Sequence, residues 1–353
     1  MTNNTSSSLE ALHFNSATND EQFKTEDTDA IVNNITIVLY VLTIVLGTAG
    51  NTVVIWVAGF KLKPTVTNVW LVNLAVADLI FCISRSLPLT KNLFFDYWPF
   101  GEFLCKFVGF FKYANMFCSV FLLSVISMDR VLCIWHPLIT KQRRTLCTAL
   151  LVSTAVWLGV IILSAPYFVY RKVYKDERNM SKCSMEDKKN TERDKLALYC
   201  IRFLCGFLLP FLVILSCYIL AGLGLLRTRL SRKSRPLRIL VLLVLAFFLC
   251  WAPYHCFLLA KWVNKKNKVV KAGVYLSQAF AYFNSCVNPL LYFFMGLNVR
   301  GSKFGRSLVG VYQRALADDG DGHNNVRREY DTSGSGSQPA MLISLTQVNV
   351  ANV

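Results

Sequence analysis

The chain has 353 residues, of which 54% are hydrophobic and only 17% are charged. This composition excludes an ordinary soluble protein and is typical of a membrane protein. The formal net charge of +17 would suit a nucleic-acid partner, but almost all basic residues lie in short stretches between apolar runs. That distribution fits the flanks and loops of membrane spans, so we expect no nucleic-acid binding.

Residues 1–34 form a polar, acidic arm before the first apolar run. The arm carries six acidic side chains against a single lysine, Lys24. It lacks an apolar stretch followed by a small-residue cleavage site, so we predict no cleaved signal peptide and expect the first span to act as an uncleaved anchor. Sequons for N-glycosylation occur at Asn3, Asn4, Asn34 and Asn179.

Seven apolar runs follow the arm. They cover roughly residues 35–60, 68–91, 103–135, 147–169, 197–226, 236–261 and 272–296. A spanning helix needs about 20 predominantly apolar residues. We therefore predict an all-α membrane protein whose seven-transmembrane helix bundle occupies residues 35–296. Polar residues at mid-membrane depth, such as Asp78, Asn284 and Asn288, are costly in lipid and should face the bundle interior.

Loop charge does not orient the bundle by itself, because both sides are basic. Lys61 and Lys63 follow the first span while acidic residues precede it, which favours an extracellular N-terminus. The sequons fall on that same side, as do two span-flanking cysteines, Cys105 and Cys183. We therefore predict a multi-pass plasma-membrane protein with its N-terminus outside and a Cys105–Cys183 disulfide on the oxidising side.

The segment after the seventh run has two parts. Residues 297–316 place Val299, Phe304, Leu308 and Val311 on one stripe, with basic residues elsewhere. This pattern predicts a short amphipathic helix eight on the inner membrane surface. Residues 317–353 contain several glycines and serines and are predicted to be a disordered cytoplasmic tail. The basic third loop and helix eight suit anionic membrane lipids.

Seven signatures occur in order along the apolar runs. They are Gly50-Asn51, Leu74-Ala75-Val76-Ala77-Asp78-Leu79, Asp129-Arg130-Val131, Trp157, Pro210 with Tyr218, Cys250-Trp251-Ala252-Pro253 and Asn288-Pro289-Leu290-Leu291-Tyr292. This set resembles the rhodopsin-like, or class A, G-protein-coupled receptors over roughly residues 35 to 315. The resemblance implies a receptor whose partner inside the cell is a heterotrimeric G protein.

Within the bundle, the resemblance implies two functional sets. The first holds an allosteric sodium ion in the family, and its positions are Asp78, Asn115, Ser119, Asn284 and Asn288. Such oxygens can also bond to water alone, and no other cofactor is expected. The second set is made of helix-kinking prolines and packed aromatic rings that transmit activation, at Pro210, Phe247, Trp251, Pro253 and Pro289.

At the cytoplasmic end of the bundle, the resemblance assigns G-protein coupling to Asp129 and Arg130. The resemblance also implies that Tyr218 and Tyr292 swing toward this arginine in the active state. Lys233 stands where many relatives have an acid that holds the arginine inactive, so that ionic restraint is not expected here. Candidate phosphorylation sites for arrestin recruitment lie in the tail, at Thr332, Ser333, Ser335 and Ser337.

Further sequence segments resemble one branch of the class. It includes Asn115-Met116-Phe117, Arg202-Phe203-Leu204-Cys205-Gly206-Phe207, Ser234-Arg235-Pro236-Leu237-Arg238 and Phe247-Phe248-Leu249-Cys250-Trp251. These segments are similar to the chemoattractant receptors, in the formyl-peptide and chemerin-receptor cluster near the anaphylatoxin receptors. The branch implies a peptide or small-protein ligand, coupling mainly to an inhibitory G protein, and roles in chemotaxis and the inflammatory response.

Two basic residues inside apolar runs indicate the charge of the ligand. Lys112 and Arg202 would be desolvated there, and buried cations require an anion. By family analogy Arg202 would grip a carboxylate or carbonyl of a peptide end. We expect help from Lys112, Arg85 and the basic loop at Arg171 and Lys172. The expected aromatic walls are Tyr113, Tyr254 and His255.

Other functions remain open at this point. Seven spans with buried polar residues also suit a transporter or channel, although no internal repeat supports that reading. An acidic lipid would also satisfy the buried cations, and a ligand-scavenging decoy would keep the same fold. No enzyme is expected, because the four histidines are scattered and no nucleophile or metal spacing is present.

Overall fold

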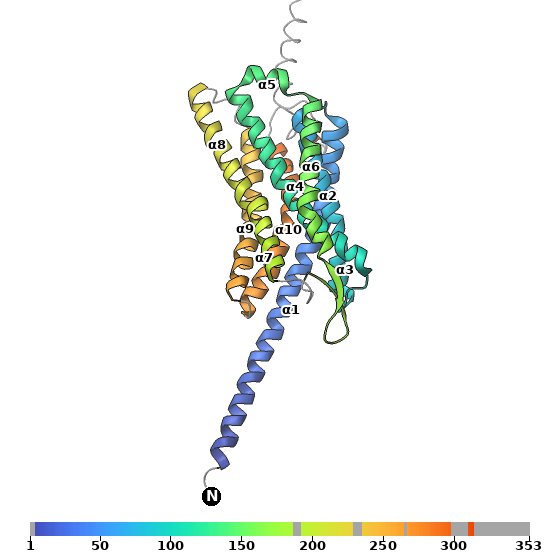
Figure 1. The fold of residues 1–353 in the computed structure, drawn as a ribbon, viewed down its shortest axis with the longest axis vertical. Helices are drawn as coiled ribbons and strands as arrows, with labels where there is room; N and C mark the ends of the chain where they lie inside the picture. The colour runs from blue at the N-terminus through green and yellow to red at the C-terminus, as the bar shows by residue number, and fades with distance from the viewer. Residues whose placement is uncertain (1–3, 186–191, 229–234, 265–266, 298–309, 314–353) are drawn as a thin grey trace, which may run out of the picture. The chain divides into compact units, whose positions relative to one another are not determined.

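The computed structural model describes residues 4–185, 192–228, 235–264, 267–297 and 310–313, with only the backbone described for 4–29 and a few residues at helix ends. Long helices dominate it (Figure 1). In chain order they are α1 (Asn4–Trp56), α2 (Val66–Ser84), α3 (Ser86–Phe94), α4 (Gly101–Trp135), α5 (Pro137–Arg143), α6 (Leu146–Val169), α7 (Glu192–Phe203), α8 (Leu209–Thr228), α9 (Arg235–Val263) and α10 (Lys268–Leu297). Two π-helical turns, η1 (Val57–Lys61) and η2 (Leu204–Leu208), extend α1 and join α7 to α8.

These helices form seven membrane-length units that correspond to the seven predicted runs. Six units of the described chain are long and apolar enough to cross a bilayer: α1 with η1, α2 with α3, α4, α6, α7 with α8, and α9. The seventh unit, α10, is 30 residues long. Its lower hydropathy follows from interior polar residues such as Asn284, Ser285 and Asn288, which face the bundle rather than lipid.

Prolines explain where the helices bend or break. Pro88 has no N–H and its ring opposes the carbonyl of Ser84, which is where α2 ends and α3 begins. In the same way, the ring of Pro210 opposes the carbonyl of Gly206, and the helix there takes the wider π-helical form of η2. Pro253 and Pro289 lie inside α9 and α10. These breaks open space between the helices.

A β-hairpin caps one end of the bundle. Strands β1 (Lys172–Lys175) and β2 (Ser181–Ser184) pair antiparallel, with Val173 opposite Cys183. Asp176 closes the turn by accepting bonds of 2.9 Å from the N–H groups of Arg178 and Met180. The Lys182 ammonium, 2.7 Å away, lowers the pKa of the Asp176 carboxyl below its usual value. The predicted Cys105–Cys183 disulfide is present and fixes the hairpin on α4.

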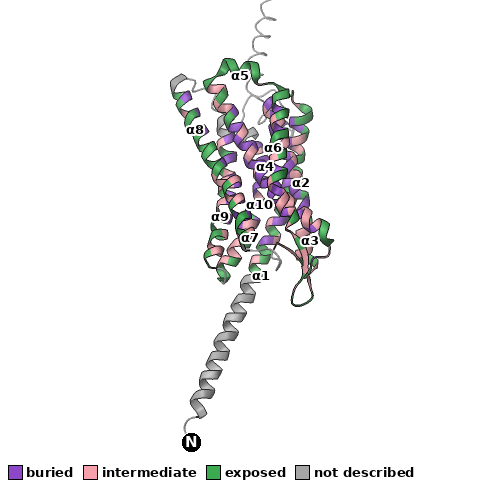
Figure 2. Ribbon diagram, viewed as in Figure 1, coloured by how far each residue is buried: buried purple, intermediate pink, exposed green. Residues whose placement is uncertain are grey.

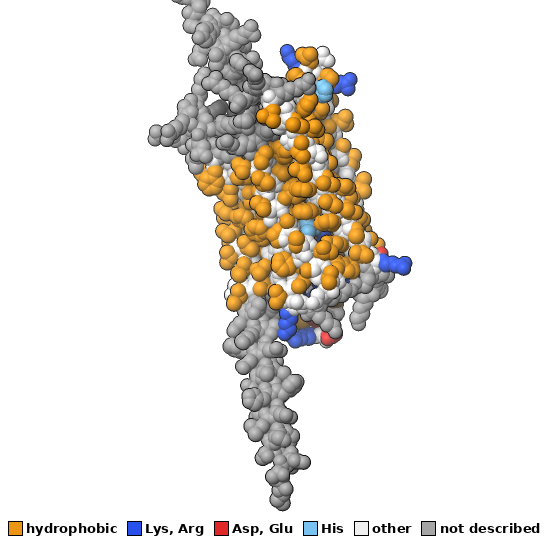
Figure 3. Space-filling model, turned by 90° about the vertical axis from the view of Figure 1, so that its left-hand side faces the viewer, with side chains coloured by type: hydrophobic (Ala, Val, Ile, Leu, Met, Phe, Trp, Pro, Cys, Tyr) orange, Lys and Arg blue, Asp and Glu red, His pale blue; other side chains and the backbone are white. Residues whose placement is uncertain are grey.

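The core lies along α4, which contacts α2, α6, α8, α9 and the hairpin. Buried residues gather on the inward faces of the helices, and exposed residues lie outside (Figure 2). Gly50 lets α1 approach α10, since a Cβ there would lie 2.6 Å from Pro289. On the face shown in Figure 3, hydrophobic side chains cover most of the described bundle, while basic ones lie near its two ends. An apolar belt between charged ends is the surface of a membrane span.

Several predictions concern segments with little or no described structure. The acidic arm belongs to the backbone of α1, which is already helical from Asn4. Of helix eight only residues 310–313 are described, and they are helical, with Val311 and Tyr312 buried. Lys233, most of 297–316 and the whole tail 317–353 lie outside the described residues.

Candidate functional site

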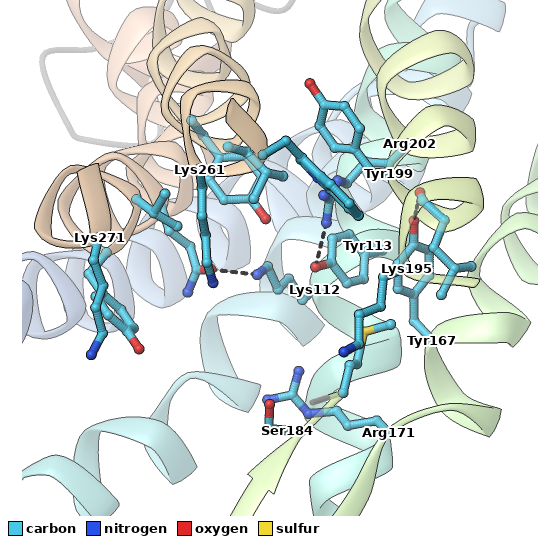
Figure 4. Close-up of a pocket in the computed structure, with 18 residues that line it drawn as sticks. Lys112, Tyr113, Tyr167, Arg171, Ser184, Lys195, Tyr199, Arg202, Lys261 and Lys271 are labelled. Atoms are coloured by element: carbon cyan, nitrogen blue, oxygen red, sulfur yellow. Dashed lines mark hydrogen bonds between the residues drawn. The ribbon is translucent and has the colours of Figure 1, made fainter. Parts of the chain in front are cut away.

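A cavity of about 530 Å³ opens between the helices at the hairpin end of the bundle. Its walls come from α4, α6, α7, α9, α10 and the hairpin region (Figure 4). The lining includes five of the predicted ligand residues, Lys112, Tyr113, Arg171, Arg202 and Tyr254. The helix break at η2 closely follows the lining residue Arg202, and Arg85, at the break between α2 and α3, donates to Val108 of α4, four residues from the lining residue Lys112.

Lys112 and Arg202 share the same two aromatic rings in the cavity. Lys112 Nζ lies 4.9 Å from the Tyr113 ring centre and 5.4 Å from that of Tyr254. The Arg202 guanidinium carbon lies 5.1 Å and 5.4 Å from the same rings. Such cation–π contacts compensate part of the cost of desolvating two positive charges.

The hydrogen-bond partners of these two cations are neutral. Lys112 donates to Gln278 Oε1 at 2.7 Å, and Arg202 Nη1 donates to the Tyr113 hydroxyl at 2.8 Å (Figure 4). Arg202 Nε is buried without a hydrogen-bond partner. A buried guanidinium normally pairs with an acid, so the geometry leaves donors available for an anionic ligand.

Arg171, which follows α6, supplies a third cation to the cavity. Its Nε lies 3.1 Å from Cys183 Sγ, and its Nη2 donates to the Cys183 carbonyl at 3.5 Å. Its stem crosses α4 at Gly109, where an added Cβ would lie 2.4 Å from Arg171 Cδ. Burial lowers the pKa of this guanidinium from its ordinary value, but an arginine still keeps its charge at neutral pH.

The described lining of the cavity is rich in basic side chains. Six of its described residues are basic, and none of the described lining residues is acidic: Lys112, Arg171, Lys195, Arg202, Lys261 and Lys271. Five tyrosines complete much of the wall, at Tyr113, Tyr167, Tyr199, Tyr254 and Tyr275. Charge and aromatic surface therefore coincide at this end of the bundle.

Two other predicted ligand residues, Arg85 and His255, lie outside the cavity lining. Arg85 is only 2% exposed, donates to the Val108 carbonyl at 2.9 Å and lies over the Phe81 ring at 4.6 Å. His255 packs against Phe207, with ring centres 4.8 Å apart, and both ring nitrogens are without hydrogen bonds. The break before α3 turns Arg85 toward α4, and the pitch of α9 turns His255 toward η2 and α7.

The predicted sodium positions come together at the centre of the bundle. Asp78 Oδ2 accepts from Asn288 at 2.8 Å, and Asn115 donates to Ser285 Oγ at 2.9 Å. Four buried oxygens lack a hydrogen-bond partner: Asp78 Oδ1, Asn115 Oδ1, Ser119 Oγ and Asn284 Oδ1. Hard cations bind such carboxylate, amide and hydroxyl oxygens, so the donor set fits sodium.

The predicted packing switch lies between this polar centre and the cavity. Phe247 and Trp251 are both buried, with ring centres 6.1 Å apart. Pro210 is buried where η2 joins α8, while Pro253 and Pro289 interrupt the backbone bonding of α9 and α10. The structure thus places these residues in one continuous core.

At the end opposite the cavity, Asp129 is shared by two arginines. Arg144 Nε donates to both carboxylate oxygens, at 3.0 and 3.3 Å, and Arg130 lies 3.6 Å from Oδ2. Both arginines also donate to Thr67 Oγ1. The hydroxyls of Tyr218 and Tyr292 are buried without hydrogen-bond partners. Arg130 is therefore held by its own helix and by α2.

Two of the four sequons have described side chains, and both are exposed. Asn34 lies on α1, and Asn179 lies in the hairpin turn with a left-handed φ of 61°. Asparagine tolerates this conformation better than most residues. Asn3 lies outside the described residues, and only the backbone is described at Asn4.

The fold and its two polar ends define a class of membrane protein, the seven-helix receptors. The model of the 7 transmembrane receptor (rhodopsin family) matches residues 50–292, and the chain belongs to this family. It is accordingly a multi-pass plasma-membrane protein and a receptor rather than an enzyme, transporter or channel.

Relatives place the chain in the chemoattractant branch. It is 39% identical over 293 residues to the C3a anaphylatoxin chemotactic receptor of Danio rerio, covering 82% of this chain and 79% of the relative. It is 35% identical to formyl peptide receptor 2 of Mus musculus, covering 88% and 92%. Chemerin-like receptor 1 of Mus musculus is 36% identical, covering 80% of each chain. The chain is thus a chemoattractant-type G-protein-coupled receptor.

Sequence patterns did not single out several residues of the site. Gln278 belongs to none of the sequence signatures, yet its Oε1 accepts a hydrogen bond from the ammonium of Lys112. Tyr167 and Tyr199 line the cavity, although aromatic residues in spans are more often packing. Arg144 is a loop arginine with no motif around it, yet it donates to Asp129. One sequence signal does exist for Gln278: it lies four residues before Tyr282, a buried tyrosine whose ring centre is 5.7 Å from Lys112 Nζ, and residues four apart share one face of a helix.

Proposed function

We propose that this receptor recognises the anionic end of a chemoattractant peptide or small protein, and that it couples mainly to an inhibitory G protein. The observation that supports the ligand charge is that three cations of the cavity, Lys112, Arg171 and Arg202, donate only to neutral groups, and that no acid is among the described lining residues. Buried charges are costly unless they are paired. An anionic ligand group would supply the missing pair.

The size and wall of the cavity favour a peptide end. About 530 Å³ lies within the range of roughly 300–1,000 Å³ typical of small-ligand sites, so only a terminal segment of a small protein would enter. Tyrosine hydroxyls and lysines suit a peptide backbone better than a long acyl chain, which needs an apolar sleeve. The names of two relatives refer to a formyl peptide and to the anaphylatoxin C3a, in agreement with this ligand class.

The test is Arg202→Gln in the full-length receptor expressed in cells. Inhibition of cyclic AMP formation is measured against pools of synthetic peptides with free carboxyl ends, with surface expression monitored in parallel. We expect potency to fall about tenfold to a hundredfold, because a charge-assisted bond to the ligand is lost. Arg193→Gln is the matched control, since Arg193 is exposed on the same helix outside the cavity. Unchanged potency in Arg202→Gln, or activation by acidic lipids alone, would contradict the proposal.

For signalling, the proposal assigns the end with Arg130 to the cytoplasm. Release of Arg130 from Thr67 and Asp129 would let it reach the G protein, while Tyr218 and Tyr292, whose hydroxyls are unbonded, move toward it. Arg130→Gln should abolish G-protein activation with ligand binding retained. A receptor that still signals after this change would not use Arg130 as proposed. A receptor that binds peptides without activating any G protein would instead be a decoy.

The proposal also includes an orientation in the membrane, which the disulfide and the exposed sequons support. Disulfides form on the oxidising side of a membrane, so the hairpin end and the N-terminus would be extracellular. Asn34 and Asn179 would then be accessible for glycosylation. Glycosidase treatment should shift the gel mobility of the receptor, and the part of the shift due to Asn179 should vanish in Asn179→Gln. Arrestin recruitment through the serines and threonines of the tail completes the proposal.

A sodium ion among Asp78, Asn115, Ser119, Asn284 and Asn288 would act as an allosteric cofactor. The four unpartnered oxygens support it, because they would satisfy a cation together with the Asp78 charge. Sodium chloride should raise the melting temperature of the purified receptor relative to N-methylglucamine chloride. Asp78→Asn should remove that difference. An equal sodium effect in Asp78→Asn would place the ion elsewhere.

A further inference from the structure

The cations of the cavity are arranged at two depths along α4. Lys112 and Arg202 surround Tyr113 and Tyr254, and this inner pair shares both rings. Arg171 crosses α4 at Gly109, four residues nearer the hairpin end than Tyr113. Four residues of α-helix correspond to about 6 Å along the axis. Arg171 therefore forms an outer cationic position, about one helical turn from the inner pair.

Arg171 is fixed in this outer position. Its Nε and Nη2 both point to Cys183, which the disulfide binds to Cys105 on α4. No hydrogen bond from its Nη1 is present within the described residues. Figure 4 shows Arg171 entering the cavity from the hairpin, while Arg202 descends from the opposite side. The side chain cannot swing to join Arg202 without leaving Cys183.

One carboxylate cannot serve as the anionic partner of both the inner pair and Arg171. The inner pair already occupies the available neutral acceptors, the Tyr113 hydroxyl and Gln278 Oε1, and Arg202 Nε remains buried and unpartnered. Arg171 lies about one turn away, and its Nη1 is the donor that an acceptor there would meet. The described lining residues offer no acid to either position. The cavity thus presents two separate vacant partnerships for anions.

We propose that the receptor binds two anionic groups of a single peptide end. The terminal carboxylate contacts Lys112 and Arg202, and an acidic side chain one or two residues earlier contacts Arg171. An extended peptide advances about 3.3–3.6 Å per residue, so one or two residues span the step along α4. This inference rests on the proposed peptide function and narrows its ligand class to acidic-tailed peptides.

The probe is a set of synthetic hexapeptides in four matched forms. For each hexapeptide that activates the wild-type receptor, the acidic position is chosen as either the penultimate residue or the residue before it. The four forms then combine a free or an amidated C-terminus with Asp or Asn at that position. G-protein activation is measured in membranes that contain the full-length receptor. The form with a free carboxylate and Asp should be the most potent, and each neutralisation should lower potency about tenfold or more.

Variants assign the two groups to their cations. Arg171→Gln should abolish the preference for Asp over Asn and keep the preference for the free acid over the amide. Arg202→Gln should abolish the preference for the free acid over the amide and keep the preference for Asp over Asn. Gly109→Ala removes no charge but displaces the Arg171 stem, so it should weaken the Asp preference alone. Arg178→Gln, at the exposed hairpin turn outside the lining, should leave both preferences unchanged.

The outcomes separate the two proposals. Peptides that activate the receptor equally with Asp or Asn would overturn the second anionic contact and leave the proposed function standing. Equal loss of both preferences in Arg171→Gln and Arg202→Gln would show a single anionic site. Activation by dicarboxylic fatty acids and by no peptide would overturn both. Should Arg171→Gln fail to reach the surface, Gly109→Ala decides the assignment.

Discussion

The two ends of the bundle handle buried positive charge in opposite ways. At the hairpin end, Lys112 and Arg202 bond only to neutral oxygens, and no acid is among the lining residues that the structure describes. At the far end, Arg130 and Arg144 share Asp129 and Thr67. One end leaves its cations available to an external anion, while the other supplies the anion from within the chain.

This difference suggests how the receptor rests and how it is activated. The far end is closed by its own contacts, so signalling requires that Asp129 and Thr67 release Arg130. The cavity gains a charge partner only when ligand enters. Phe247 and Trp251 lie in the core between the two ends, below the Tyr254 ring that contacts both cavity cations. Ligand binding can therefore reach the packing switch through Tyr254.

The largest expected effect comes from making the cavity resemble the far end. Gln278→Glu places a carboxylate on Lys112, where Gln278 Oε1 now accepts at 2.7 Å. This internal anion should compete with the ligand and lower the potency of carboxylate-ended peptides about tenfold to a hundredfold. It should also raise the melting temperature of the ligand-free receptor. Concentration–response curves and thermal melting measure both effects.

Gln278→Leu is the matched control, because it removes the acceptor without adding a charge. It should lower the melting temperature and leave peptide potency near that of the wild type. If Gln278→Glu binds carboxylate-ended peptides as well as the wild type does, Lys112 is not a ligand contact.

A smaller effect is expected from making the far end resemble the cavity. Arg144→Gln removes the strongest contact of Asp129, which then keeps only Arg130 at 3.6 Å. The pair is partly exposed, so its contribution is about 1 kcal/mol or less, and basal nucleotide exchange should rise about threefold to fivefold. Arg143→Gln changes an exposed neighbour and serves as the control. A basal rate equal to that of the wild type would show that Arg144 does not restrain Arg130.

Much of the fold and of the candidate site was predictable from the sequence, because these features depend on composition and local pattern. Seven apolar runs defined the bundle, and Asp78 and Asn288, far apart in sequence, do meet at 2.8 Å in the interior. Cys105 and Cys183 were placed by their position at span ends and form the disulfide. Lys112 and Arg202 stood out because charges are rare in spans.

The remaining features depend on chain directions that no local pattern encodes. Arg85 and Lys112 are both basic and both lie within predicted apolar runs, but the break caused by Pro88 turns Arg85 onto the Val108 carbonyl. Arg171 reaches the cavity while the adjacent Lys172 is exposed, since the disulfide and Gly109 determine how the hairpin lies on α4. These outcomes required three-dimensional packing.

The smallest expected effect tests whether the closed far end extends to α8. Trp135, on the turn of α4 after Arg130, donates Nε1–H to the Leu220 carbonyl at 2.9 Å, which ties α4 to α8. Trp135→Phe removes this one neutral bond and keeps most of the ring, so basal activity should rise only about twofold. Trp56→Phe, at an exposed tryptophan on α1, should change nothing. Basal activity is measured by nucleotide exchange without ligand. No rise in Trp135→Phe would confine the restraint to Asp129, Thr67 and the two arginines, and the far end would then be closed from the side of α2 alone.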